Sequence, residues 1–245
     1  MNYDIHYEKE VTSTNTLLKD FAAKGAPEGY TLVAQSQTSG RGRLGRSFYS
    51  PPGSGLYFSL LLRPGIPVKP AALTCLSAVA LAESVQSYDI PCAIKWVNDL
   101  YLDNKKAAGI LTEGAFEPDG SFSYAIIGIG LNLYLPDNIP SELKSIMTGI
   151  FKDGSKAPAP NEILKLILQK IAFYYEQLPD ITFWDKYRNM LNCFGRKVSF
   201  FDHGILKYGV AEDIDHDFRL IIHSESECFS LERGEVNFNR VGGGG

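Results

Sequence analysis

Residues 40–46 read GRGRLGR, so three arginines and three glycines share seven positions. Glycine lets a backbone approach a ligand closely, and arginine presents planar, paired donors to a carboxylate or a phosphate. Arg41, Arg43 and Arg46 have no acidic residue near them in the sequence. This composition fits either a solvated surface loop or a loop that closes on a small anion.

The same stretch satisfies the spacing G-x-G-x-x-G of a dinucleotide-binding turn. Such a turn works because a helix follows it directly and points its first amides at the pyrophosphate. Here Pro51, Pro52 and two further glycines follow, and they forbid a helix. A kinase glycine loop and a P-loop are also excluded, since the sequence contains no HRD, DFG or GK[ST] string.

Four other fragments carry chemistry, and the first two also have a plainer alternative. STN at residues 13–15 puts two hydroxyls and an amide at a strand-to-helix junction, where helix capping is the alternative. KWVND at 95–99 follows an apolar stretch, where the alternative is a strand end with a buried tryptophan. KKAAGI at 105–110 sets lysines before small residues, and GIGLN at 128–132 puts an amide after two glycines that mark close backbone approach. Each fragment is weak alone, but the set is specific.

In this order and at these separations, STN, GRGRLGR, KWVND, KKAAGILTE and GIGLN resemble the motifs of the biotin protein ligases, also called biotin–acetyl-CoA-carboxylase ligases. One position departs from the family pattern, since Val97 stands where a proline is usual. The resemblance implies an α+β fold of the class II aminoacyl-tRNA synthetase type, with a mixed sheet flanked by helices. It also implies a small C-terminal SH3-like β-barrel.

The resemblance further implies a reaction in two steps. Biotin and ATP are the expected substrates, Mg²⁺ is expected to bridge the phosphates, and the first product is biotinyl-5'-AMP. The biotin is then transferred to a lysine of a biotin carboxyl carrier protein domain. Because the acyl group is already activated as an adenylate with AMP as its leaving group, no nucleophilic triad is expected.

Site residues are carried over from the family position by position. Lys106 and Arg43 are the expected catalytic cations. The residues expected at biotin are Ser13, Thr14, Asn15, Gln37, Gly40, Arg41, Gly42, Arg43, Lys106 and Gly109. Those expected at the nucleotide are Arg41, Arg43, Lys95, Asn98, Asp99 and Asn132, and no residue is assigned to a metal with confidence.

The elements that must position these residues follow from hydrophobic periodicity and turn signals. Helices are predicted at 14–25, from Pro70 to residue 87, at 161–178 and at 181–191. Strands are predicted at 30–35, 55–62, 93–97, 107–116 and 123–135, with DNKK as the turn between the third and fourth. Five short strands from residue 196 to 238 predict the small barrel. The expected divisions are a catalytic domain at 1–192, the barrel at 193–240 and a flexible glycine tail at 241–245.

Composition argues against several classes of protein. The 245 residues carry a formal net charge of −4, which argues against a protein that grips nucleic acid through many phosphates. No apolar run reaches the length of a membrane span, and no signal peptide begins the sequence. The four cysteines form no C-x-x-C pair and fit reduced, packed thiols, so a cytoplasmic protein is expected. The sequence leaves open whether the protein forms a homodimer.

Two alternatives to a biotin ligase are weighed. A lipoate or octanoyl protein ligase shares the fold, and GRGRLGR favours biotin. A biotin-responsive DNA-binding regulator needs an N-terminal helix-turn-helix domain, and STN already begins at residue 13. The expected form is therefore the one without that domain.

Overall fold

The structure is a computed structural model that describes residues 1–152, 157–225, 227–232, 234 and 236–238. The expected glycine tail at 241–245 and the last two residues of the expected barrel lie outside these ranges. In chain order the elements are β1 Asp4–Val11, α1 Thr14–Ala23, β2 Tyr30–Gln37, the 3-10 turn η1 Arg43–Gly45, β3 Gly55–Leu62, α2 Pro70–Gln86, β4 Ala93–Lys95, β5 Asp99–Leu102, β6 Lys105–Phe116, β7 Phe122–Asn132, α3 Ser141–Lys144, α4 Pro160–Tyr175, α5 Trp184–Met190, β8 Lys197–Asp202, β9 Ile205–Ile214, β10 Leu220–His223, β11 Cys228–Leu231 and β12 Asn237–Phe238.

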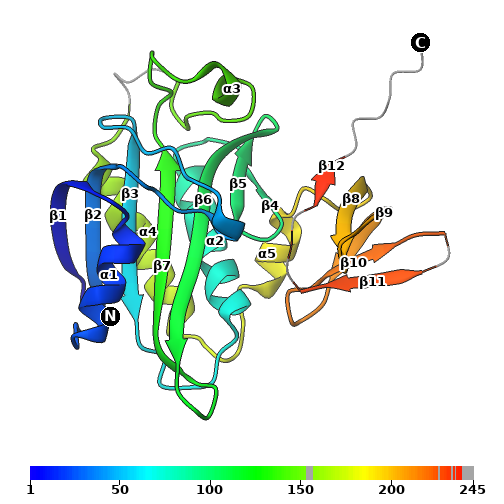
Figure 1. The fold of residues 1–245 in the computed structure, drawn as a ribbon, viewed down its shortest axis with the longest axis horizontal. Coiled ribbons are helices and arrows are strands. Elements are labelled where there is room, and N and C mark those ends of the chain that lie inside the picture. The colour runs from blue at the N-terminus through cyan, green and yellow to red at the C-terminus, as the bar shows by residue number, and fades with distance from the viewer. Residues whose placement is uncertain (153–156, 226, 233, 235, 239–245) are drawn as a thin grey trace.

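The larger sheet has the strand order β1-β2-β3-β7-β6-β5-β4. Strands β1 and β2 run parallel, and the other neighbouring pairs are antiparallel. This is the mixed sheet that the sequence predicts. Figure 1 shows α1 on the viewer's side of the sheet and α2 with α4 behind it.

Alternation along the strands separates the two faces of this sheet. Leu60 and Leu62 of β3 belong to the main hydrophobic core. Leu61 and Ile126 point the other way and pack with Leu18 of α1 in a smaller cluster. Every second residue of β7, counted from Ile126, therefore faces α1. The site is built on this face of the sheet.

Helix α2 is buried almost throughout, which explains its lack of a polar face. It begins with Pro70 at its first turn, where a missing N–H costs nothing. Leu73, Leu76 and Val79 are fully buried in the main core. The helix packs against α4 and against the back of the sheet (Figure 1).

The smaller sheet has the order β11-β10-β9-β8-β12 and is antiparallel. It packs directly against the larger part. Phe218 stacks on Phe183 with ring centroids 5.7 Å apart and meets Tyr187 edge-on at 5.9 Å. The core of both sheets is one continuous cluster.

Both tryptophans of the chain tie the two parts together by hydrogen bonds. Trp96 Nε1 donates to the carbonyl of Phe218 at 3.1 Å. Trp184 Nε1 donates to the carbonyl of Asp215 at 3.0 Å. The indole groups are therefore satisfied across the junction.

The predicted helices at 14–25, 70–87, 161–178 and 181–191 are confirmed, with ends shifted by a few residues. Two strands were missed. The strand at 4–11 was not predicted, and neither was β5, which lies between the strand predicted at 93–97 and the predicted turn DNKK. The turn is only Asp103–Asn104, both at positive φ (47° and 61°). Asp and Asn tolerate this region, so a two-residue hairpin forms, and Lys106 becomes a strand residue.

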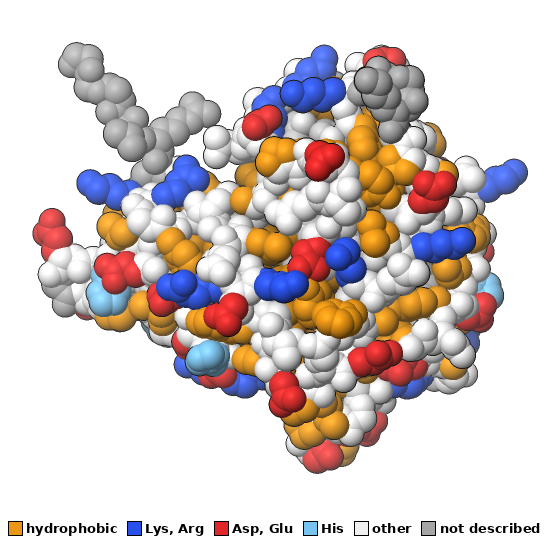
Figure 2. All heavy atoms as spheres, turned by 180° about the vertical axis from the view of Figure 1, so that it is seen from behind, with side chains coloured by type: hydrophobic (Ala, Val, Ile, Leu, Met, Phe, Trp, Pro, Cys, Tyr) orange, Lys and Arg blue, Asp and Glu red, His pale blue; other side chains and the backbone are white. Residues whose placement is uncertain are grey.

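Further expectations from composition can be compared with the structure. Cys75 and Cys193 are buried free thiols and Cys92 is half-buried, but Cys228 is exposed and is not packed as expected. Within the described ranges, no helix is long and apolar enough to cross a membrane. On the face seen in Figure 2, acidic and basic side chains are interspersed and do not gather into one basic region.

Candidate active site

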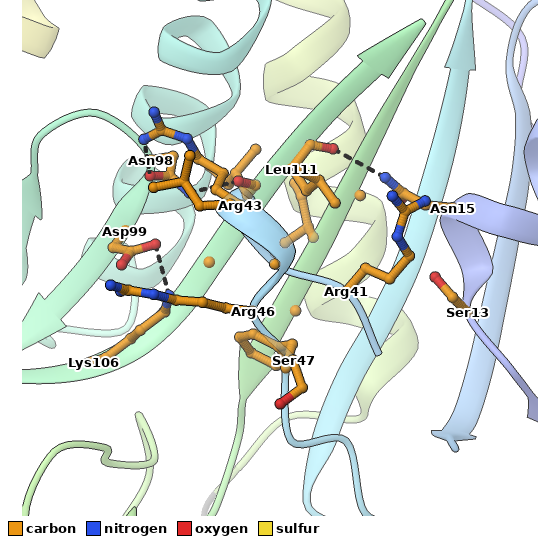
Figure 3. Close-up of a pocket in the computed structure, with 18 of the residues that line it drawn as sticks. Ser13, Asn15, Arg41, Arg43, Arg46, Ser47, Asn98, Asp99, Lys106 and Leu111 are labelled. Carbon is orange, nitrogen blue, oxygen red and sulfur yellow. Dashed lines mark hydrogen bonds and ion pairs between the residues drawn. The ribbon is translucent and has the colours of Figure 1, made fainter. Parts of the chain in front are cut away.

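One cavity lies over β6 and β7 on the α1 face of the large sheet, beneath the glycine-rich loop (Figure 3). Most residues singled out from the sequence meet there. The lining includes Ser13, Thr14, Asn15, Gln37, Arg41, Gly42, Arg43, Lys95, Asn98, Asp99, Lys106 and Gly109. Gly40 and Asn132 lie outside the lining.

Asn15 is held rigidly at one end of the cavity. Its Oδ1 accepts a hydrogen bond from Ser59 at 2.6 Å, and its Nδ2 donates to the carbonyl of Leu111 at 3.2 Å and to Glu113 at 3.0 Å. A Cβ on Gly128 would lie 2.0 Å from Asn15 Oδ1. The glycine is therefore required so that the amide can lie flat against β7.

The start of α1 is capped in an unexpected way. Ser13 occupies the N-cap position, but its hydroxyl makes no capping hydrogen bond. The carboxamide oxygen of Gln37 accepts from the backbone N–H of Thr14 at 2.9 Å, and its nitrogen donates to Ser50 at 2.9 Å. Helix capping is therefore not what the Ser13 side chain does.

The glycine-rich loop is a short hairpin. Gly42 N donates to the carbonyl of Arg46 at 2.7 Å, and Phe48 N donates to the carbonyl of Gly40 at 2.8 Å. The chain reverses at Leu44, whose φ is 55° and whose side chain is 72% exposed. Gly40 serves packing, because a Cβ there would lie 2.4 Å from the carbonyl oxygen of Phe48.

The arginines of this loop have partners far away in the sequence. Two nitrogens of Arg41 approach the two oxygens of Glu113, with Nη1 to Oε2 at 3.3 Å and Nη2 to Oε1 at 3.1 Å. Arg43 Nη1 donates to Asn98 Oδ1 at 2.9 Å. No acidic residue neighbours these arginines along the chain, but Glu113 lies beside Arg41 in space.

Glu113 also binds Lys19 and Asn15. Burial acts to raise the pKa of Glu113, but hydrogen bonds from Lys19 and Asn15 and the charges of Lys19 and Arg41 outweigh it, so the pKa is lowered. Lys19 Nζ lies 2.5 Å from Glu113 Oε1. The carboxylate is thus kept ionised.

Asn98 sits in a turn fixed from two sides. Its Nδ2 donates to the carbonyl of Ile110 at 2.7 Å, and the Trp96–Val97 peptide, one residue earlier than the bond to Asn98, is cis. The buried hydroxyl of Tyr187 donates to the carbonyl of Val97 at 2.8 Å. The turn that presents Asn98 to Arg43 is therefore anchored by both β6 and α5.

Lys106 faces the cavity from β6 and forms an ion pair with Asp99 at 2.8 Å (Figure 3). A Cβ on Gly109 would lie 3.1 Å from Lys106 Nζ, so glycine makes room for this pair. The Lys106 ammonium also lies 5.8 Å from the centre of the Phe48 ring. These contacts hold a cation at the opposite end of the cavity from Asn15.

Two expected nucleotide residues are more deeply placed. Lys95 is 9% exposed, and its Nζ lies 5.5 Å from the Tyr101 ring centre and 5.7 Å from that of Phe238. The amide of Asn132 donates to the carbonyl of Thr148 at 3.3 Å and reaches that of Lys106 at 3.5 Å. Asn132 therefore braces the strand that carries Lys106.

Several lining residues were not assigned to biotin or to the nucleotide from the sequence. They are Leu44, Arg46, Ser47, Phe48, Trp96, Ile110, Leu111, Gly128, Ile129, Gly130 and Gly234. A Cβ on Gly130 would lie 2.4 Å from the Phe48 ring. The two glycines of GIGLN do mark close approach, but the groups that approach are protein side chains.

No cluster of three or more His, Cys, Asp or Glu side chains suited to a metal occurs among the residues that the structure describes. Asp99 Oδ1 is a buried oxygen that pairs with the Lys106 ammonium at 2.8 Å and makes no further hydrogen bond. It is a hard oxygen donor at the cationic end of the cavity. A cation that brings its own anionic ligands could use it.

Comparisons with known proteins agree with this geometry. Residues 7–132 match the biotin/lipoate A/B protein ligase family. The chain is 30% identical over 236 residues to the biotin–acetyl-CoA-carboxylase ligase of Mycobacterium tuberculosis, covering 91% of this chain and 85% of that protein. It is 40% identical over 172 residues to the bifunctional ligase/repressor BirA of Bacillus spizizenii, covering 69% of this chain and 53% of that protein.

The match thus spans about half the length of that Bacillus relative. Among solved structures, the biotin protein ligase from Aquifex aeolicus in complex with biotin and ATP superposes with a TM-score of 0.83. The identity is 29%, with 97% of this chain and 99% of that chain covered.

Proposed function

Because this chain belongs to the biotin/lipoate A/B protein ligase family, we propose that it is an ATP-dependent biotin protein ligase. The observation that supports this most directly is the lining of one cavity. It joins the polar groups around Asn15, with Arg41 beside them, to the cations Arg43 and Lys106. An uncharged, hydrogen-bonding ring system at one end and an anionic junction at the other match that arrangement.

In the first step, a carboxylate oxygen of biotin attacks the α-phosphorus of ATP. The bond from that phosphorus to the pyrophosphate oxygen breaks, and biotinyl-5'-AMP forms. Because anion meets anion, fixed cations lower the barrier by electrostatic stabilisation and positioning. Arg43 and Lys106 are proposed to be those cations, each held by a partner across the cavity, Asn98 and Asp99 respectively.

In the second step, a lysine amine of a biotin carboxyl carrier protein domain attacks the acyl carbon. The bond to AMP breaks and the amine loses a proton. The glycine-rich loop is proposed to cover the adenylate until the carrier arrives, which protects the mixed anhydride from water.

The remaining roles follow the same division. Ser13, Thr14 and Asn15 are proposed to lie at the ureido ring, with Gln37 orienting Thr14. Lys95 and Asn98 are proposed to serve the nucleotide. Gly40 and Asn132 contribute through packing and bracing.

Mg²⁺ fits the site as a partner of the phosphates. It is commonly held by one or two carboxylates together with substrate phosphates, and Asp99 Oδ1 offers a buried oxygen at the cationic end. When bound, the ion would neutralise phosphate charge. The cytoplasm, where ATP and the carrier meet, is the compartment proposed for the reaction.

Exchange of labelled pyrophosphate into ATP tests the proposal, with biotin, lipoate and octanoate supplied in turn. Exchange that depends on biotin is expected, because only then does the adenylate form reversibly. Lys106→Ala should lower it by about 10²- to 10³-fold, as for the loss of one preorganised donor. Exchange driven equally well by lipoate would contradict the biotin assignment, and avidin blotting of a purified carrier domain checks the second step.

A further inference from the structure

Glu113 is an acidic side chain that contacts both α1 and the glycine-rich loop beside the cavity. It lies on β6, is 17% exposed, and uses both oxygens. Oε1 contacts Lys19 at 2.5 Å and Arg41 at 3.1 Å, while Oε2 accepts from Asn15 at 3.0 Å and from Arg41 at 3.3 Å. It therefore ties α1, the glycine-rich loop and β6 to one carboxylate.

The contact with Arg41 has the forked geometry of a strong pair, with two guanidinium nitrogens on two carboxylate oxygens. Elsewhere the loop is held by its own backbone hydrogen bonds and by the contact of Arg43 with Asn98, while the side chain of its tip residue Leu44 is 72% exposed. A glycine-rich segment of this kind loses much conformational entropy when it is ordered. One anchored arginine reduces the number of conformations that remain.

Glu113 does not cancel the positive charge of this region. Lys19 and Arg41 supply two cations against one carboxylate, so one net positive charge remains near Asn15. The anchor can thus order the loop without removing its attraction for an anion.

We propose that Glu113 is a positioning residue that holds Arg41, and with it the glycine-rich loop, over the cavity before any ligand binds. Its consequence for substrate affinity rests on the proposed function, whereas its effect on the loop of the ligand-free protein does not. The Glu113 carboxylate thus serves as an anion for the loop within the protein itself. Ligand binding then begins from a glycine-rich loop that is already partly ordered.

Limited trypsin digestion of the ligand-free protein tests the anchor. Glu113→Gln keeps the shape of the side chain and an acceptor for Asn15, but it removes the charge that binds Arg41. Cleavage after Arg43 and Arg46 is expected to accelerate by about threefold to tenfold, the range for a partly exposed, forked ion pair.

Glu83→Gln is the matched control. Glu83 is also a half-buried carboxylate paired with two lysines, Lys170 and Lys186, but it lies on α2, and its partners belong to α4 and α5 and not to the glycine-rich loop. It should leave loop cleavage unchanged. Equal cleavage rates in the protein, Glu113→Gln and Glu83→Gln would overturn the proposal, provided that melting curves show all three folded.

A double-mutant cycle shows whether Glu113 acts through Arg41. Arg41→Gln should accelerate cleavage after Arg43 and Arg46 as Glu113→Gln does, and the double variant should be no faster than either. Independent, multiplying effects would mean that Glu113 works through Asn15 or Lys19, which contradicts the anchor.

Steady-state kinetics separate positioning from general destabilisation. For Glu113→Gln, the KM for biotin should rise about threefold to tenfold while kcat stays within about twofold, because binding must now order the loop. Faster loop cleavage in a protein without biotin-dependent exchange would refute the ligase function and leave the anchor standing. An unchanged KM with unchanged cleavage would refute the anchor alone.

Discussion

Two glycines of β7 matter for the space that they leave and not for their backbone angles. Neither Gly128 nor Gly130 has positive φ. A Cβ on Gly128 would lie 2.0 Å from Asn15 Oδ1, and one on Gly130 would lie 2.4 Å from the Phe48 ring. Each glycine therefore sets the position of one cavity-lining side chain.

Replacing Gly128 with alanine tests this role. The new methyl group must displace Asn15 from its hydrogen bonds with Ser59 and Glu113. Overpacking of this kind should lower the free energy of unfolding by about 1–3 kcal/mol, and it should weaken biotin binding measured by calorimetry.

Gly65→Ala is the control for Gly128→Ala. A Cβ on Gly65 meets no atom within 4 Å, and its φ is not positive. Urea unfolding should change by no more than about 0.5 kcal/mol, and biotin binding should be unaffected. If Gly128→Ala binds biotin as well as Gly65→Ala does, Asn15 is not a biotin contact.

At the scale of elements, Glu83 joins three helices. From α2 it accepts hydrogen bonds from Tyr174 of α4 at 2.9 Å and from Lys186, on α5, at 2.6 Å. Burial acts to raise the pKa of Glu83, but these hydrogen bonds and the charge of Lys170 outweigh it and lower the pKa. The carboxylate therefore stabilises the helical layer only while it is ionised.

The lowered pKa of Glu83 predicts a defined acid sensitivity. A group whose folded pKa lies below its unfolded value contributes stability above the unfolded value, here near 4.5, and loses it as pH falls through the folded pKa. The difference in urea midpoint between the protein and Glu83→Gln should therefore be full near neutral pH and should shrink below about pH 4.5. A difference that stays constant down to pH 3 would mean that Glu83 is not responsible.

The elements also show what the sequence could predict. Helices such as α2 and α4 were predictable, because a buried or amphipathic period of 3.6 is a local property. Strand β1 was missed because its residues DIHYEKEV are mostly exposed at the edge of the sheet, so no buried alternation marks them. The joint location of STN, GRGRLGR and KKAAGI could be inferred only from the family resemblance.

Glu113 was within one of the recognised motifs and was still not assigned a role. Its partners Asn15 and Arg41 lie 98 and 72 residues away along the chain. Local pattern gives no sign of such pairing, since it depends on the strand register that sets β6 beside β7 and beneath the loop. This separation along the chain also explains why no acidic partner for Arg41 is visible in the sequence near residues 40–46.

At the scale of the whole molecule, the smaller sheet is built into the core and does not hang from the rest by a linker. Phe218 packs on Phe183 and Tyr187, and a single cluster of buried residues runs through both parts. Interfaces of this kind favour unfolding in one cooperative step.

The two tryptophans report on that cooperativity. Trp96 and Trp184 each donate a hydrogen bond to a carbonyl beside the smaller sheet, so their fluorescence should change when the parts separate. Urea transitions followed by tryptophan fluorescence and by far-UV circular dichroism should coincide. If the fluorescence transition comes first, with most secondary structure intact, the smaller sheet separates as an independent unit.

The anchoring of Val97 by Tyr187 and of Trp96 by Phe218 also has a consequence for the growing chain on the ribosome. Proteins are synthesised from the N-terminus at about 5–20 residues per second. Nearly all of the cavity-lining residues have been added by residue 130, yet the groups that fix the turn at Asn98 come at positions 187 and 218. A nascent chain therefore holds the parts of its site for several seconds before it can assemble them, and it acquires the site geometry only when the smaller sheet has emerged.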